Sequence, residues 1–247
     1  MSMTDLAIIG GTGLTSLNGL EIIRREVVHT PYGEPSGPLT HGRLADRNVV
    51  FLARHGYAHT IPPHKVNYRA NIWALKSIGV HQVLAMAAVG GIRADMRPGW
   101  LAFPDQIVDY TYRRAHTFFE QDLERVTHVD FTHPYDAGLR RRLIAAAQAA
   151  RLQFVAAGTY GATQGPRLET AAEIRRMERD GCDLVGMTGM PEAALAREQQ
   201  LAYACCAVIA NRAAGKSRED IHAEIEIYLK QGMDQVRALL EVLLPGL

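Results

Sequence analysis

Apolar residues of this chain gather in short, unbroken runs, and glycine or polar residues bound most of these runs. Apolar residues at successive positions, rather than at alternate ones, are typical of strands that are covered on both faces of a sheet. The runs predict strands at residues 6–9, 48–53, 82–89, 154–157, 183–187 and 203–210.

The segments between these runs have helical patterns of apolar and charged residues. They cover residues 64–78, 136–152, 169–179, 191–199 and 219–244. Strand and helix alternate along the chain, which favours a layered α/β fold with much parallel pairing. No linker rich in Pro, Gly or Ser divides the chain and no internal repeat is found, so we expect a single domain of residues 1–247.

Composition narrows the partners that this fold can have. Hydrophobic residues make up 47% of the chain and charged residues 21%, which is enough apolar material for a large core. The net charge is +1 and no basic stripe is found, so a nucleic acid or an acidic membrane is not an expected partner. No apolar segment has membrane-spanning length and the first residues lack the pattern of an export signal, so a cytoplasmic location is expected.

The cysteines and histidines do not form a metal-binding pattern. Cys182, Cys205 and Cys206 are an odd number, and the last two lie in a predicted strand, so they are interpreted as packing residues rather than disulfides. The ten histidines are accompanied by no Cys-x-x-Cys pair and no His-Glu-x-x-His helix. The sequence therefore predicts no metal site.

Residues with anion-binding chemistry follow several predicted strands, in segments 10–13, 54–56, 87–91 and 187–192. Ligands of layered α/β proteins gather at the carboxyl ends of strands. Thr12 lies among glycines that leave backbone N–H groups accessible, and the guanidinium fork of Arg54 matches two phosphate oxygens. Thr188 precedes a predicted helix with Pro191 at its first position, so its hydroxyl faces a positive helix end. Together these segments predict a site for an oxyanion.

Two nucleotide-binding motifs are incomplete. The dinucleotide motif Gly-x-Gly-x-x-Gly fails after Gly11, because Ser16 occupies its third glycine position. Residues 214–217 end like a Walker loop, but Ala210 stands where the opening glycine belongs. Neither a dinucleotide cofactor nor nucleoside triphosphate hydrolysis is expected.

The residues of several motifs, and their order along the chain, resemble those of a known family. They are IIGGTGL at 8–14, LARHG at 52–56, VNYRANIWALK at 66–76, GPR at 165–167 and MTGMPE at 187–192. With these motifs the chain resembles the trimeric purine nucleoside phosphorylases, in particular the branch that contains methylthioadenosine phosphorylase. The resemblance implies a three-layer fold with a central mixed, largely parallel sheet flanked by helices. It also implies no cofactor, inorganic phosphate as co-substrate, and a homotrimer or a hexamer made of two trimers.

The resemblance also implies roles for individual residues. Met187 is expected to lie against the ribose, and Ala87 replaces a side chain that is often polar in relatives. His128 matches a histidine that reaches the 5′ pocket of a neighbouring subunit, although it could also be a simple surface-loop residue. The residues expected to bind phosphate are Thr12, Arg54, His55, Ala88 through its backbone, and Thr188.

The base pocket differs from that of the adenosine-type relatives. Asn211 and Ala213 stand where those relatives have two aspartates that read adenine. An Asn amide can donate to a 6-oxo group or to N7, whereas an ionised carboxylate only accepts. Glu169 matches a glutamate that accepts from the N1–H of 6-oxopurines, with Leu168 beside it as a further substrate contact. The alternative for Glu169 is an ordinary acidic residue in the first turn of a helix.

The sequence leaves the 5′ group of the sugar open. His222 resembles a histidine that contacts a 5′-hydroxyl, whereas the phosphate-side motifs resemble the methylthio branch, whose 5′ group needs an apolar wall. Ile225 lies one helical turn from His222 and could line the same pocket. The first expectation is S-methyl-5′-thioinosine, and the alternative is inosine or guanosine.

The reaction implied is phosphorolysis without a covalent intermediate, with Asn211 as the catalytic residue that stabilises charge on the leaving base. An asparagine cannot supply a proton, so no general acid is assigned. Two other classes are weighed against this one: a nucleoside hydrolase, in which water replaces phosphate, and a non-catalytic module that binds purine or phosphate.

Overall fold

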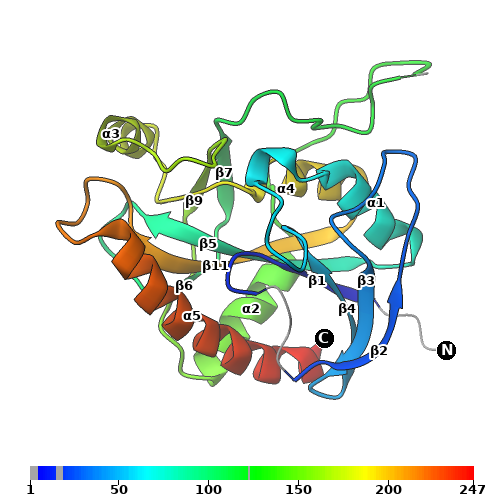
Figure 1. The fold of residues 1–247 in the computed structure, drawn as a ribbon, viewed down its shortest axis with the longest axis horizontal. Helices are drawn as coiled ribbons and strands as arrows, with labels where there is room; N and C mark the ends of the chain where they lie inside the picture. Colours follow the sequence, from blue (N-terminus) through cyan, green and yellow to red (C-terminus); the bar gives the residue numbers. More distant parts are fainter. Residues whose placement is uncertain (1–4, 15–18, 122) are drawn as a thin grey trace.

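A computed structural model describes residues 5–14, 19–121 and 123–247, so Ser16 of the incomplete dinucleotide motif lies outside the described residues. One sheet of eleven strands runs through the molecule, with the central order β2-β3-β4-β1-β5-β10-β9-β7 (Figure 1). A second path leads from β5 through β11 and β6 to β8. The strands are β1 (Leu6–Gly10), β2 (Glu21–Glu26), β3 (Leu39–Leu44), β4 (Arg47–Ala53), β5 (Gln82–Gly91), β6 (Leu101–Ala102), β7 (Gln106–Asp109), β8 (Phe154–Val155), β9 (Thr159–Ala162), β10 (Leu184–Gly186) and β11 (Ala202–Arg212).

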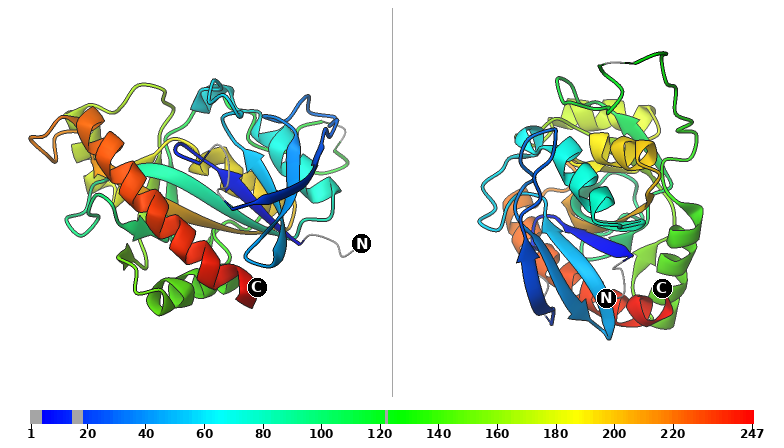
Figure 2. Two further views of the ribbon diagram at one scale, coloured as in Figure 1. Left: turned by 60° about the horizontal axis from the view of Figure 1, so that its bottom comes forward. Right: turned by 90° about the vertical axis from the view of Figure 1, so that its right-hand side faces the viewer.

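Helices cover both faces of the sheet, which gives three layers (Figures 1 and 2). Alternate residues of β1 supply the two cores: Ala7 and Ile9 pack on the side of α1 and α4, while Leu6 and Ile8 pack on the side of α2 and α5. This alternation explains why β1 is apolar at every position. The helices are α1 (Tyr68–Ser77), α2 (Ala137–Ala149), α3 (Ala171–Arg179), α4 (Gly189–Glu198) and α5 (Ile221–Leu243).

Most helices begin at a side chain that caps them. Asn67, Asp136 and Asp220 each accept a hydrogen bond from a backbone N–H in the first turn of α1, α2 and α5. Thr170 and Glu173 form a complete capping box at the start of α3. Helices α1, α2, α3 and α5 start one to four residues later than predicted, whereas α4 starts two residues earlier.

The long strand β5 is unpaired along part of one edge. On that edge β1 pairs with Gln82 to Ala85 in parallel, and β10 pairs with Gly90 and Gly91 in antiparallel orientation. Between these two ladders, no described strand pairs with residues 86–89 on this edge, while β11 pairs with β5 along its whole opposite edge. A gap therefore opens at the centre of the sheet.

The α/β layered fold predicted from the sequence is confirmed, and each predicted strand overlaps an observed one. Five strands were not predicted: β2, β3, β6, β7 and β9. The outer strand β2 is exposed and rich in charge, β6 has only two residues, and neither forms a long apolar run. Among the described residues, no helix combines the length and the apolarity needed to cross a membrane.

Candidate functional site

A cavity of about 400 Å³ lies at the gap in the sheet and collects residues from all four segments singled out at strand ends. It is lined by Gly11, Thr12, Arg54, His55, His59, Thr60, Ile61, Pro62, Pro63, Ala87, Ala88, Val89, Gly90, Pro166, Leu168, Glu169, Val185, Gly186, Met187, Thr188, Ala210, Asn211, Ala213, Ala214, Ile221 and Ile225.

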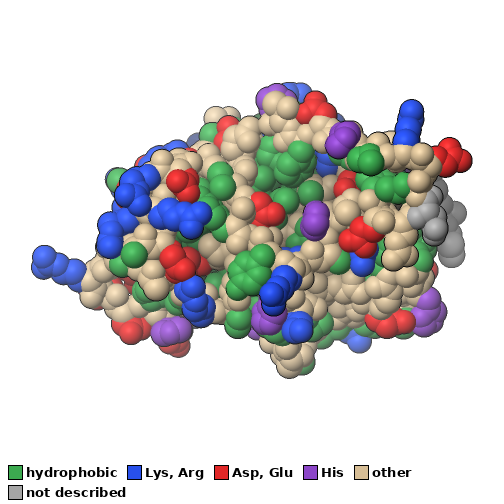
Figure 3. Space-filling view, turned by 90° about the horizontal axis from the view of Figure 1, so that it is seen from above, with side chains coloured by type: hydrophobic (Ala, Val, Ile, Leu, Met, Phe, Trp, Pro, Cys, Tyr) green, Lys and Arg blue, Asp and Glu red, His purple; other side chains and the backbone are tan. Residues whose placement is uncertain are grey.

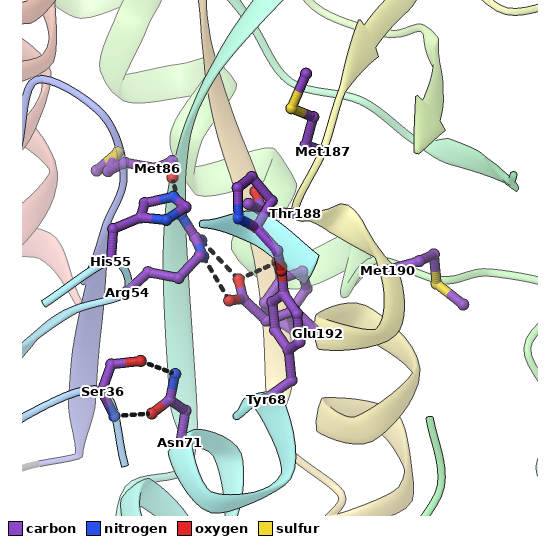
Figure 4. Close-up of polar contacts among 12 residues, drawn as sticks. Ser36, Arg54, His55, Tyr68, Asn71, Met86, Met187, Thr188, Met190 and Glu192 are labelled. Carbon is purple, nitrogen blue, oxygen red and sulfur yellow. Dashed lines mark hydrogen bonds and ion pairs between the residues drawn. The ribbon is translucent and has the colours of Figure 1, made fainter. Parts of the chain in front are cut away.

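Arg54 follows β4, and its guanidinium is fully buried beside the cavity (Figure 4). Its Nε and Nη2 atoms donate to the two carboxylate oxygens of Glu192 at 2.6 and 2.7 Å, and Nη1 donates to the carbonyl of Met86 at 2.7 Å. A guanidinium has five N–H donors, so one on Nη1 and one on Nη2 are left. The fork expected to face an anion is thus turned to Glu192, and only the outer edge is available to a ligand.

Glu192 holds Arg54 in this orientation. The carboxylate is completely buried in α4 and also accepts a hydrogen bond from the Tyr203 hydroxyl at 2.8 Å. Burial disfavours a charged guanidinium, but the charge and hydrogen bonds of Glu192 outweigh burial, so the pKa of Arg54 is raised. Burial also raises the pKa of Tyr203 well above its ordinary value, so this hydroxyl stays a donor. Arg54 is therefore a fixed cation.

His55 is a neutral imidazole with a defined orientation. Its Nδ1 lies 2.8 Å from the carbonyl of Ile61, which makes Nδ1 the protonated nitrogen. Burial, and next the charge of Arg54, lower the pKa of His55 to about 4. The other nitrogen, Nε2, is left as a hydrogen-bond acceptor.

Thr12 and His59 lie together near the carboxyl end of β1. The hydroxyl of Thr12 is 3.2 Å from Nε2 of His59, and the rings of His55 and His59 are 5.1 Å apart. A side chain at Gly11 would approach the Met86 carbonyl to 2.6 Å and Arg54 Nη1 to 3.1 Å, so only glycine allows the chain to pass this close to the guanidinium.

Thr188 precedes α4 and is buried, and its side chain makes no capping hydrogen bond. Met190 has an extended backbone, so the regular helix begins at Pro191, as the sequence predicted. Thr188 lines the cavity next to a helix N-terminus.

Backbone groups of β5 also face the cavity. Met86 directs its carbonyl towards Arg54 and away from β11, and backbone groups of a strand point to the same edge at every second residue. Ala88, two residues later, therefore directs its N–H into the gap between β1 and β10. Ala88 lines the cavity, in agreement with its predicted place.

Asn211 reaches the cavity because of a bulge in β11. The register with β5 shifts between Ile209 and Asn211, and Ala210 is the extra residue. Asn211 is buried, and its Nδ2 donates to the carbonyl of Arg212 at 2.7 Å, which leaves one amide N–H and the amide oxygen for other partners.

Glu169 and Leu168 line the cavity on the loop before α3. Oε1 of Glu169 accepts a hydrogen bond from the Thr163 hydroxyl at 2.6 Å. The structure thus brings a carboxylate from this loop and the Asn211 amide from β11 to the same cavity, together with Met187 and Ala213.

Two predicted residues lie elsewhere. His222 is exposed and is absent from the cavity lining, because α5 turns its Ile221 and Ile225 side chains, four residues apart, to the cavity and places His222 on another face. His128 is exposed on the segment between β7 and α2 and does not line the cavity of its own chain. Their contacts with a substrate stay predictions.

Some residues of the site had no role assigned from the sequence: Glu192, His59, Thr163 and Arg114. Glu192 was part of a recognised motif, but its partner Arg54 lies 138 positions away. The buried Arg114 donates to the carbonyls of Met187 and Met190 at 2.8 and 2.6 Å, and no motif marked it.

Within the described residues no cluster of three or more His, Cys, Asp or Glu side chains could hold a metal ion. The three cysteines are free and buried. On the face shown in Figure 3, positive and negative side chains are interspersed.

Comparisons with known proteins identify the family of the chain. The sequence profile described as Phosphorylase superfamily matches residues 5–244. The probable S-methyl-5′-thioinosine phosphorylase of Pseudomonas syringae pv. tomato is 59% identical over 239 residues, which cover 96% of this chain and 97% of that protein. The 6-oxopurine nucleoside phosphorylase of Pyrococcus furiosus is 47% identical over 245 residues, which cover 96% of this chain and 91% of that protein.

A solved structure matches as well. Methylthioadenosine phosphorylase from Schistosoma mansoni in complex with adenine has a TM-score of 0.91 and 31% identity, over 98% of this chain and 91% of that one. The chain belongs to the phosphorylase superfamily, and the resemblance to nucleoside phosphorylases drawn from its motifs is confirmed.

Proposed function

We propose that this protein is a purine nucleoside phosphorylase that cleaves 6-oxopurine nucleosides with inorganic phosphate, and that S-methyl-5′-thioinosine is its preferred substrate. The products are hypoxanthine and S-methyl-5-thioribose 1-phosphate. The observation that carries the proposal is one cavity lined by Glu169 and Asn211 as well as by Arg54, His55 and Thr188. The names of the relatives in Pseudomonas syringae and Pyrococcus furiosus support the same class of substrate.

The phosphate end of the cavity combines a cation with hydrogen-bond donors. The outer edge of Arg54, the Thr12 and Thr188 hydroxyls and the Ala88 N–H are suited to oxygens that carry negative charge. Neutral His55 offers Nε2 as an acceptor, so it binds a phosphate oxygen that still carries its proton. We infer that the monoprotonated phosphate dianion is the species that this end accepts.

The base end favours a 6-oxopurine. The N1–H of hypoxanthine donates to the Glu169 carboxylate, whereas adenine offers only a lone pair there. The free N–H of Asn211 donates to O6 or N7 and stabilises the electron pair that the base takes when its bond to C1′ breaks. Phosphate oxygen then forms the new bond to C1′ from the opposite face. Solvent or the base itself completes the protonation, because Asn211 has no proton to give.

The 5′ end favours an apolar substituent. Ile221 and Ile225 line the cavity, whereas His222, which would suit a hydroxyl, is exposed outside it. This placement supports a methylthio group over the 5′-hydroxyl of inosine or guanosine. We further propose that the protein acts without a cofactor, as one domain, and as a homotrimer or a hexamer of two trimers.

The test compares kcat/KM for methylthioinosine, methylthioadenosine, inosine and guanosine, with and without phosphate. We expect turnover only with phosphate, and an advantage of methylthioinosine over methylthioadenosine of about 5- to 150-fold, the value of one buried unpaired polar group. Cleavage without phosphate would identify a hydrolase, and substrate that binds but stays intact would identify a binding module.

The variant Asn211→Asp should shift preference towards adenine nucleosides, and an unchanged ranking of bases would contradict the role of Asn211.

A further inference from the structure

The side of Glu169 that is turned away from the cavity is held by Thr163. The hydroxyl of Thr163 lies 2.6 Å from Oε1 of Glu169. Glu169 lines both the main cavity and a neighbouring hollow, whereas Thr163 lines only the hollow. Glu169 therefore stands in the wall between two spaces, with Thr163 behind it and Oε2 left for the substrate side.

The direction of this hydrogen bond follows from chemistry. An ionised carboxylate only accepts, so the hydroxyl of Thr163 must donate. The carbonyl of Gly186, at 3.3 Å, is the other acceptor within reach, but the 2.6 Å distance to Glu169 is typical of a charge-assisted bond. The single hydroxyl proton is thus committed to Glu169.

The backbone of Thr163 is itself fixed from two sides. Its N–H donates to the carbonyl of Gly186 at 2.8 Å, and its carbonyl accepts from Nη2 of Arg114 at 3.2 Å. Gly186 is directly followed by Met187, which lines the cavity. The hydroxyl of Thr163 therefore fixes Glu169 relative to the turn that carries Met187.

Without this tether, Glu169 would have another partner. It lies on a partly exposed loop, two residues after Arg167, an exposed cation that now pairs with Glu173 at 2.7 and 2.8 Å. A released Glu169 carboxylate could turn to Arg167 or to solvent. It could then also turn away from an adenine ring, which removes the penalty that discriminates against adenine.

We propose that Thr163 is a specificity-determining positioning residue, which holds Glu169 so that Oε2 faces the protonated ring nitrogen of a 6-oxopurine. This inference rests on the proposed function of the same cavity. Selectivity then depends on a carboxylate that is fixed in place, and not only on the presence of a carboxylate.

The test uses Thr163→Val, which removes the hydroxyl at nearly constant volume, and Thr163→Ser as the matched control that keeps it. For Thr163→Val we expect kcat/KM for methylthioinosine to fall about three- to tenfold, the value of one ordinary hydrogen bond. The rate with methylthioadenosine should stay or rise, so the ratio of the two narrows, while KM for phosphate stays unchanged. Thr163→Ser should retain the wild-type ratio. Inhibition constants of hypoxanthine and adenine give an independent measure of base binding.

A double-mutant cycle with Glu169→Gln separates positioning from general damage. If Thr163 acts through the Glu169 carboxylate, Thr163→Val should change kcat/KM by less than about twofold when Glu169 is already glutamine. An equal factor in both backgrounds, or an unchanged substrate ratio in Thr163→Val, would overturn the inference. If Thr163→Val does not fold, Thr163→Ala enters the same cycle.

Failure of this inference is distinct from failure of the proposed function. A wild-type enzyme without preference for 6-oxopurines, or without need of phosphate, contradicts the function itself. A selective wild-type enzyme whose selectivity survives the loss of the Thr163 hydroxyl contradicts only the role of Thr163.

Discussion

At the scale of single residues, the site places a permanently charged side chain, Arg54, next to a neutral ring, that of His55. Arg54 keeps its charge because it is buried in an ion pair with Glu192. His55 lies beside Arg54, makes no hydrogen bond to a carboxylate among the described residues, and stays neutral. In the proposed function, these two adjacent residues offer a phosphate ion both a cation and an acceptor. The arrangement matches an anion that carries one proton.

The neutral state of His55 has a measurable cost to stability at low pH. Its pKa is lowered from 6.5 to about 4 by burial first and by Arg54 second, while His59 lowers it and Glu192 raises it to smaller extents. Above pH 6.5 the ring is neutral in both the folded and the unfolded protein. As pH falls below 6.5, the unfolded chain binds a proton that the folded protein does not, so the folded state loses stability until about pH 4.

We therefore expect His55 to lower the free energy of unfolding by about 2 kcal/mol between pH 7.5 and pH 5. Urea unfolding at several pH values measures this change, and His55→Gln, which has no titrating ring, is the control. The pH dependence of the wild type should exceed that of the variant by this amount. Parallel profiles would show that His55 is not neutral in the folded protein.

At the scale of secondary-structure elements, Arg114 joins two segments that line the cavity. Its Nη1 donates to the carbonyls of Met187 and Met190, and its Nη2 donates to those of Thr163 and Gln164 at 3.2 and 2.8 Å. One guanidinium thereby fixes the turn after β10 against the loop after β9. Only a planar group with donors in several directions can make these contacts together.

For this reason Arg114→Lys should not be conservative. The ammonium keeps the charge but reaches fewer of the carbonyls, so we expect the free energy of unfolding to fall by about 2–3 kcal/mol. We also expect kcat/KM to fall more than tenfold, because the turn that carries Met187 and the loop that leads to Glu169 lose their common support. Thermal unfolding and steady-state kinetics measure the two effects, with Arg113→Lys, an exposed neighbour, as the control. A variant as active as the control would contradict the role of Arg114 in joining these two segments.

How far the sequence predicts this structure depends on whether the information is local. The buried strands were predicted because their apolar runs are continuous, and Thr12, Arg54 and Thr188 because they follow those runs. Asn211 and Glu169 were assigned from the family resemblance instead. The pairing of Arg54 with Glu192 was not predicted, since nothing in either segment marks a contact across 138 positions. The orientation of His222 was not predicted either, because it depends on how α5 is rotated against the sheet.

At the scale of the whole molecule, the segment between β7 and α2 has features that bear on the predicted assembly. It contains no helix or strand among its described residues (Figure 1). Leu123, Val126 and Val129, close to His128 in sequence, are exposed. His128 lies outside the cavity of its own chain. These features support the prediction that this segment packs on a second copy, with His128 at the 5′ end of the neighbour's cavity.

Complementation between subunits tests this arrangement. His128→Ala should weaken the 5′ contact made to a neighbour, and Asn211→Ala should inactivate the cavity of its own chain. In a cyclic trimer that contains both variants, one site joins an intact cavity to an intact His128, whatever the ratio of the chains. Mixed trimers purified through two different tags should therefore recover about one third of the wild-type activity, while each variant alone stays well below that value. No recovery would show that His128 does not serve a neighbouring cavity, and full activity of His128→Ala alone would show that the histidine has no role in the reaction.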